Sequence, residues 1–178
     1  MRLKPLPAPP APDAADEDDE SAADRPVFEA IADAQSAVPL VPGSENDCCA
    51  RLMRREGHPS RDVAREWLTF LRALELAVET ETGFKRTDRE PTPENVRSSF
   101  RERVFGASEA LDVLADAAEP IDAAEAFDRL RATVPGWERE RRRTWVEHWT
   151  DRTERVLDWL VALDLADRVE GGYVAAEN

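Results

Sequence analysis

The sequence is poor in the residue types that build disulfide frameworks and metal sites. It has two cysteines, Cys48 and Cys49, and two histidines, His58 and His148. Adjacent side chains on a helix point about 100° apart, so the two cysteines neither converge on one metal ion nor cross-link distant segments. We therefore expect no metal site and no cofactor, and we interpret both cysteines as small, buried or half-buried helix residues.

Sequence patterns for catalysis are also missing. The chain has no glycine-rich phosphate loop, no G-x-S-x-G nucleophile elbow and no H-E-x-x-H zinc motif. Carboxylate pairs are frequent, but 38 Asp and Glu in 178 residues produce such pairs by chance on a solvated surface. We expect a protein that is not an enzyme and has no small-molecule substrate.

Long hydrophobic runs are absent as well. No stretch approaches the about 20 apolar residues of a membrane-spanning helix, and the start MRLKPLPAPP lacks the apolar run of a secretory signal. We expect a soluble cytoplasmic protein with no membrane partner.

Lysine is scarce, because only Lys4 and Lys85 accompany the arginines, and the net charge is -14. This acidic surface with arginine in place of lysine resembles that of proteins from salt-loving archaea. Net negative charge normally argues against nucleic-acid binding. In a halophile nearly every protein is acidic, so charge alone does not separate DNA-binding from protein-binding proteins.

The most informative feature present is an internal repeat. Residues 68–84, LTFLRALELAVETETGF, return 89 positions later without a gap as residues 157–173, LDWLVALDLADRVEGGY, with eight of the 17 positions identical. Each copy has apolar residues at helical spacing, then a short extended segment, a glycine, and an aromatic (Phe84 or Tyr173) that opens a second extended segment. The pattern predicts a helix followed by a tight hairpin.

This repeat resembles the recognition helix and wing of winged helix-turn-helix domains. Recognition helices of that class end in a similar Leu-x-x-Leu-x-Leu-Ala run, followed by a hairpin with a Gly-aromatic pair. The resemblance implies a tandem winged helix-turn-helix protein of haloarchaeal type, with a mainly α fold and short β-hairpin wings.

The first unit is predicted at residues 26–88, after a disordered acidic and proline-rich tail at 1–25. Ser44 or Asn46 is expected to cap its second helix, and Pro59 and Ser60 to open a third helix that runs to about Ala77. Trp67, Phe70, Leu71 and Leu74 lie on one face of that helix and predict its core side. The wing follows as residues 78–87.

A linker is predicted at residues 89–94, where two prolines in three positions prevent a helix from crossing. The second unit then covers residues 95–178. Its first helix is expected to run from about Val96 through Leu114 and to end at Pro120. Its third helix is expected to be one extended helix between Trp137 and Leu165, because the apolar residues there follow a single helical line.

The third helix of the first unit carries a basic outward face, since Arg61, Arg65 and Arg72 project within about 40° of one another. Winged-helix proteins place this helix in the major groove and the wing against the backbone. The candidates for DNA contact that this resemblance implies are Arg61, Arg65, Thr69, Arg72, Lys85 and Arg86. The alternative is an ordinary solvated face, because Asp62 and Glu66 are interleaved.

The second unit has an acidic outward face instead, formed by Glu147, Asp151, Glu154 and Asp158, which would repel DNA. Its candidates for protein contact are Arg141, Arg142, Trp145 and Trp149. Arginines at a helix start run against the local electrostatic preference. The two tryptophans must be shielded from solvent, either by packing within the protein or in a homodimer interface.

These patterns support two functions of different classes. One is a DNA-associated regulator of transcription, in which the first unit contacts DNA and the second mediates protein contacts. The other is a non-enzymatic protein–protein adaptor, built like the tandem winged-helix subunits of segregation complexes that bind kleisins. A continuous positive strip over Arg61, Arg65, Arg72 and Arg86 would favour the regulator. Interruption of that strip by Asp62, Glu66 and Glu79 would favour the adaptor.

Overall fold

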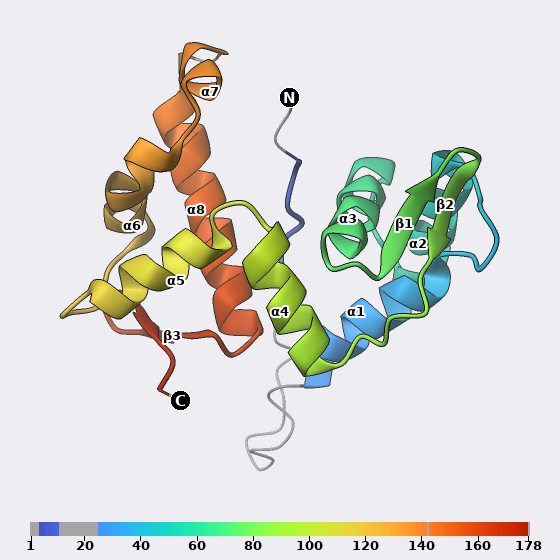
Figure 1. Ribbon diagram of the computed structural model, residues 1–178, viewed down its shortest axis with the longest axis horizontal. Coiled ribbons are helices and arrows are strands. Elements are labelled where there is room, and N and C mark those ends of the chain that lie inside the picture. The colour runs from blue at the N-terminus through green and yellow to red at the C-terminus, as the bar shows by residue number, and fades with distance from the viewer. Residues whose placement is uncertain (1–3, 11–24, 142, 178) are drawn as a thin grey trace. The chain divides into compact units, whose positions relative to one another are not determined.

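A computed structural model describes residues 4–10, 25–141 and 143–177 of the chain, which forms two compact units, Met1–Arg103 and Val104–Asn178. Both units are mainly helical, and each contains one two-stranded antiparallel sheet (Figure 1). This architecture confirms the predicted mainly α fold with two short hairpin wings.

Unit 1 begins with three helices and a hairpin: α1 (Arg25–Ala37), α2 (Glu45–Glu56), α3 (Arg61–Ala73), β1 (Ala77–Thr80) and β2 (Gly83–Arg86). The side chain of Ser44 accepts a hydrogen bond from the backbone of Asp47, and that of Ser60 accepts one from Val63, so serines cap α2 and α3. α3 ends at Ala73 rather than near Ala77, because Glu75 turns into the left-handed region (φ 62°) and breaks the helical path.

The predicted inward face of α3 is confirmed, since Trp67, Phe70, Leu71 and Leu74 are all buried. The ring of Phe70 meets those of Trp67 and Phe100 edge to face, at centroid distances of 5.9 and 6.2 Å. Such pairs are favoured by the quadrupoles of the rings. The core of unit 1 therefore reaches beyond the hairpin, to Phe100.

Phe100 belongs to α4 (Pro93–Arg103), which lies in unit 1 rather than at the start of the second unit. Ser99 and Arg103 of α4 also donate hydrogen bonds to the Glu75 carboxylate, at 3.2 and 3.1 Å. The compact units thus divide after residue 103, whereas the sequence predicts units at 26–88 and 95–178 with a linker at 89–94. Pro93 of that segment is the first residue of α4, and the two prolines do not separate the cores.

Unit 2 contains α5 (Ala107–Asp116), α6 (Ala123–Leu130), the 3-10 helix η1 (Arg131–Thr133), α7 (Gly136–Arg141), α8 (Trp145–Ala162), β3 (Ala166–Val169) and β4 (Gly172–Ala175). The expectation of one first helix from Val96 to Pro120 is wrong. Gly106 has a φ of 90°, which is incompatible with a continuing right-handed helix, and it separates α4 from α5.

The expectation of one helix between Trp137 and Leu165 is also wrong, because α7 and α8 are separate. Arg139 donates hydrogen bonds to the carbonyl oxygens of Val134, Ala132 and Arg131 (2.8, 3.3 and 3.3 Å), which attaches α7 to the preceding turn. α8 still has 18 residues against 13 in α3, so the third helix of the second unit is extended as predicted.

The sequence repeat is a structural repeat. In each unit the aromatic residue of the hairpin bridges to the segment before the second helix, Phe84 to Gly43 and Tyr173 to Ile121. The glycine before that aromatic has a φ of 140° in unit 1 and 143° in unit 2. A Cβ atom on either glycine would lie 2.2 Å from a backbone oxygen of the bridged segment, so only glycine fits.

Two further predictions concern the chain as a whole. Leu6 and Pro7 are buried, so this part of the predicted disordered tail is not a solvated leader, while its acidic block lies outside the described residues.

Within the described part of the chain, no helix combines the length and the apolar character needed to cross a membrane.

Candidate functional site

The predicted basic face of α3 is largely neutralised by acids of its own unit. Arg61 donates to the side-chain oxygen of Asn46 and lies 3.7 Å from a carboxylate oxygen of Glu45. Arg65 lies 2.7 Å from Asp62, one turn earlier on the same helix. Both arginine side chains are about half exposed, so these pairs contribute little to stability. They nevertheless interrupt the positive strip.

Arg72, the third arginine of that face, connects α3 to the wing. Its Nη2 atom lies 2.5 Å from a carboxylate oxygen of Glu79 on β1, and its guanidinium carbon lies 5.4 Å from the ring centroid of Phe84 on β2. The side chain is only 25% exposed. Arg72 therefore acts as a structural link between helix and wing, through an ion pair and a cation–π contact.

Unit 2 has a corresponding helix–wing link with the charges exchanged. Asp158 on α8 accepts a hydrogen bond from the Tyr173 hydroxyl at 2.7 Å and one from Arg168 of β3 at 3.2 Å. The Arg168 guanidinium lies 5.0 Å from the Tyr173 ring centroid. In unit 1 the helix supplies the arginine and the wing the acid, whereas in unit 2 the helix supplies the acid. In both units, therefore, side chains connect the third helix to the wing.

Tyr173 is the single tyrosine of the chain, and its environment raises the pKa of its hydroxyl well above 10, first through burial and then through Asp158. The unfolded chain releases this proton near pH 10, so the folded state binds more protons and stability falls as the pH rises above about 10. We expect tyrosinate absorbance to appear only as the second unit unfolds in alkali. A tyrosinate signal that titrates near pH 10 in the folded protein would contradict the Asp158 contact.

The two cations on the wing differ from the α3 arginines in their hydrogen-bond and ion-pair partners. Lys85 is half-buried, and Arg86 donates a hydrogen bond to the carbonyl oxygen of Ser36 at 3.4 Å. Among the described residues, neither forms an ion pair with an acid. The structure therefore divides the six DNA-contact candidates: three arginines meet acids, two wing cations do not, and Thr69 is half-buried on α3.

Two arginines that sequence reasoning did not single out lie near Arg86. Arg51 and Arg55 of α2 donate hydrogen bonds to the carbonyl oxygens of Ala37 and Ser36, at 2.9 and 3.3 Å. Their spacing of four residues places them on one face of α2. The spacing of Arg51 and Arg55 was visible in the sequence. Their hydrogen bonds to carbonyl oxygens at the end of α1 depend on the tertiary structure and were not.

The candidates for protein contact in unit 2 are mostly structural. Trp149 is 4% exposed and meets the Phe105 ring edge to face at 5.7 Å, so it is a core residue and not a surface contact. Trp145 is half-buried and meets Phe127 edge to face at 6.0 Å. The two tryptophans therefore pack within unit 2. The side chain of Arg141 and the whole of residue 142 lie outside the described part of the chain.

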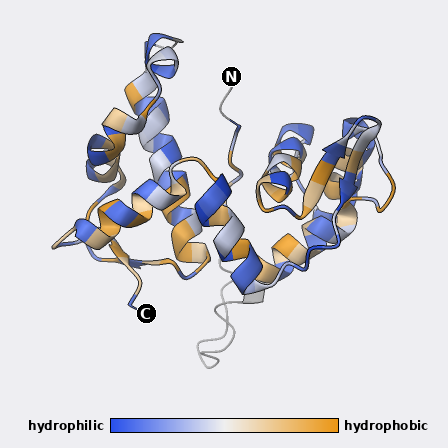
Figure 2. Cartoon of the chain, in the orientation of Figure 1, coloured by the Kyte–Doolittle hydropathy of each residue, from blue (hydrophilic) through white to orange (hydrophobic). Residues whose placement is uncertain are grey.

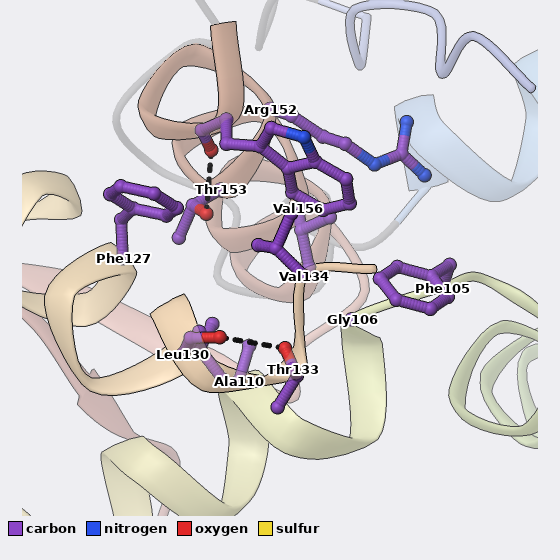
Figure 3. A pocket seen from close by; sticks show the side chains of 11 residues that line it. Phe105, Gly106, Ala110, Phe127, Leu130, Thr133, Val134, Arg152, Thr153 and Val156 are labelled. Carbon is purple, nitrogen blue, oxygen red and sulfur yellow. Dashed lines mark hydrogen bonds between the residues drawn. The ribbon is translucent and has the colours of Figure 1, made fainter. Parts of the chain in front are cut away.

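A small cavity lies beside α8, with Phe105 and Phe127 on opposite sides of it (Figure 3). Its wall is mainly apolar, and its two threonines already donate to backbone carbonyls, Thr133 to Leu130 and Thr153 to Trp149. The volume of about 20 Å³ is enough for roughly one water molecule and far below the several hundred Å³ of a ligand pocket. This cavity is a packing defect rather than a substrate site.

No cluster of three His, Cys, Asp or Glu side chains suited to a metal ion occurs within residues 4–10, 25–141 and 143–177. Cys48 and Cys49 are both buried in α2, as predicted for helix residues, and burial raises the pKa of each thiol. The surfaces that distinguish the molecule are therefore its helix–wing junctions and the arginines at the end of α1.

Comparison with known proteins agrees with this architecture. No curated protein and no solved structure matches the chain significantly. One family does match, over residues 1–178, and it is described as the halobacterial double winged helix domain. Two helix–wing units related by an internal repeat are what that description requires, and the chain belongs to this family.

Proposed function

We propose that this protein is a non-enzymatic adaptor that binds other proteins through its winged-helix units. The observation that carries the proposal is the neutralisation of the outward face of α3. Arg61, Arg65 and Arg72 each lie within ion-pair distance of an acid of the same unit. A DNA-reading helix needs such side chains free to contact base edges and phosphates.

The second unit supports the same function. Glu147, Asp151 and Glu154 are exposed along α8, at the position where a DNA-reading unit would carry cations. A phosphate backbone would meet negative charge there, on a chain whose net charge is already -14. A protein partner can present basic or apolar side chains to this surface instead.

The competing function is that of a DNA-associated regulator, with unit 1 contacting DNA and unit 2 binding protein. One observation favours it: Lys85 and Arg86 on the wing form no ion pair with an acid in the described part of the chain. Two wing cations suffice for backbone contact but not for reading a sequence, since phosphate contacts carry no base information. We therefore rank this function second.

The decisive experiment measures binding of the whole chain to a fluorescent DNA duplex of random sequence over a range of salt concentrations. We expect no saturable binding by the wild type, and we expect affinity capture from an extract of the source organism to recover partner proteins that survive nuclease treatment. The double variant Arg61→Ala/Arg65→Ala should behave as the wild type, as should the control Arg101→Ala on the exposed face of α4.

Saturable DNA binding would contradict the adaptor. If the α3 arginines carried it, Arg61→Ala/Arg65→Ala would weaken it, and the slope of log affinity against log salt would fall by about 0.9 for each lost phosphate contact. If the wing carried it, Lys85→Ala/Arg86→Ala would produce that loss instead.

A further inference from the structure

Three arginine side chains from two elements converge on the C-terminal end of α1. Arg51 and Arg55 come from the last turns of α2, and Arg86 from the end of β2. Arg51 binds the carbonyl oxygen of Ala37, while Arg55 and Arg86 both bind that of Ser36. The last carbonyls of a helix carry partial negative charge, which explains why cations gather there.

These carbonyl contacts leave most of the positive charge of the cluster unneutralised. Each guanidinium has five N–H donors, and each of these contacts uses one of them. Within residues 4–10, 25–141 and 143–177, none of the three arginines forms an ion pair. Asp33 and Glu56 lie near Arg55: burial and then the Asp33 charge raise the pKa of the Glu56 carboxyl, and the Arg55 charge opposes that rise without forming an ion pair. Donors therefore remain for an external acceptor.

Two exposed apolar side chains belong to the loop that follows the end of α1. Leu40 and Val41, in the loop between α1 and α2, are 63% and 73% exposed. The loop is tied to the wing, because the backbone N–H of Arg86 donates to Pro39 at 2.9 Å and Gly43 forms a bridge to Phe84. Figure 2 shows hydrophobic residues in this loop. Its backbone anchoring means that the apolar side chains are presented at a defined position.

We propose that Leu40, Val41, Arg51, Arg55 and Arg86, which we call the corner patch, bind an acidic polypeptide segment that also carries apolar side chains. This inference rests on the adaptor function proposed above and names the chemistry of one partner. Guanidinium groups form two parallel hydrogen bonds with a carboxylate, and Leu40 and Val41 can remove an apolar side chain of the partner from water.

Nucleic acid fits the corner patch less well. Phosphates would satisfy the arginines, but a sugar–phosphate backbone offers little apolar surface to cover Leu40 and Val41. In concentrated salt, long-range attraction is screened, since the Debye length falls to about 3 Å at 1 M. Direct charged contacts combined with apolar burial keep their strength under those conditions better than charge alone.

The test uses a phage-displayed library of random peptides, selected on the immobilised whole chain. We expect enrichment of peptides that combine Asp or Glu with large apolar residues. An enriched peptide, made with a fluorophore, should bind the wild type saturably. Arg55→Glu and Arg86→Glu should each weaken binding at least about tenfold, since each turns an attractive contact into a repulsive one. The control Arg101→Glu makes the same charge change on α4 and should bind as the wild type.

A second variant guards against misfolding of the arginine variants. Leu40→Ser/Val41→Ser alters only exposed loop side chains and should also weaken binding, with an unchanged circular dichroism spectrum. Enriched peptides that lack acids, or that bind Arg55→Glu and the wild type equally, overturn the corner patch and leave the adaptor function standing. A library without any enriched peptide also overturns the patch. Saturable binding of random DNA by the wild type would overturn the adaptor itself.

Discussion

Replacing Trp159 by Ala is expected to lower the free energy of unfolding of the second unit by about 3 to 5 kcal/mol, the usual cost of emptying a large aromatic site. The side chain is fully buried (0% exposed) on the face of α8 that packs against the rest of its unit. Trp67 holds the equivalent face of α3, is 6% exposed, and should show a loss of similar size in unit 1. Urea unfolding followed by circular dichroism measures both.

Trp137 on α7 provides the matched control, because it is 39% exposed. Its replacement by Ala should change the free energy of unfolding by less than about 1 kcal/mol, as is usual for surface positions. An unfolding midpoint for Trp159→Ala equal to that of the wild type would mean that α8 packs through another face.

Gly172→Ala is expected to destabilise the second unit by at least about 3 kcal/mol. The backbone there has a φ of 143°, a region that costs other residues about 1 to 3 kcal/mol. The new Cβ atom would also lie 2.2 Å from the carbonyl oxygen of Ile121. Relief of that clash breaks the two backbone hydrogen bonds between Ile121 and Tyr173, of 2.9 and 3.2 Å. Thermal unfolding of the purified variant gives the measurement.

The neighbouring Gly171 separates the two causes. Its φ is 96°, but the nearest atom to an added Cβ is a side-chain carbon of Pro120 at 3.9 Å. Gly171→Ala therefore carries backbone strain without a clash and should cost about 1 to 2 kcal/mol. If Gly171→Ala and Gly172→Ala lowered the free energy of unfolding equally, the clash with Ile121 would contribute nothing. Gly83→Ala tests the same geometry in unit 1, against the backbone of Gly43.

The local elements were predictable because their signals lie in short stretches of sequence. Ser44 and Ser60 each cap a helix, as expected for a serine that directly precedes a segment with apolar residues at helical spacing. The glycine and aromatic of each repeat specify a hairpin, since the glycine alone tolerates the required backbone and the close approach of the bridged segment. The core side of α3 follows from helical periodicity alone, and Trp67 and Leu71 are buried accordingly.

Helix lengths and unit boundaries were less predictable. Apolar periodicity continues across Gly106, because α4 and α5 both bury residues at helical spacing. In α7 the apolar Trp137 is exposed, and the periodic apolar residues begin only at Trp145. The positive φ of Gly106 separates α4 from α5, and no periodic pattern marks the break between α7 and α8. Phe100 joins unit 1 because it meets Phe70, a long-range contact that no local pattern records.

The sequence by itself determined that two helix–wing units follow one another, because helical periodicity, caps and hairpin glycines act between neighbours in the chain. Only the tertiary structure decided which charges remain available. A long arginine side chain can reach several acids or carbonyls, and the fold selects among them: Arg72 meets Glu79, while Arg55 and Arg86 meet the end of α1. Charge counted along one helix face therefore does not show which cations stay without an acidic partner, since neutralisation depends on distances between side chains from different elements.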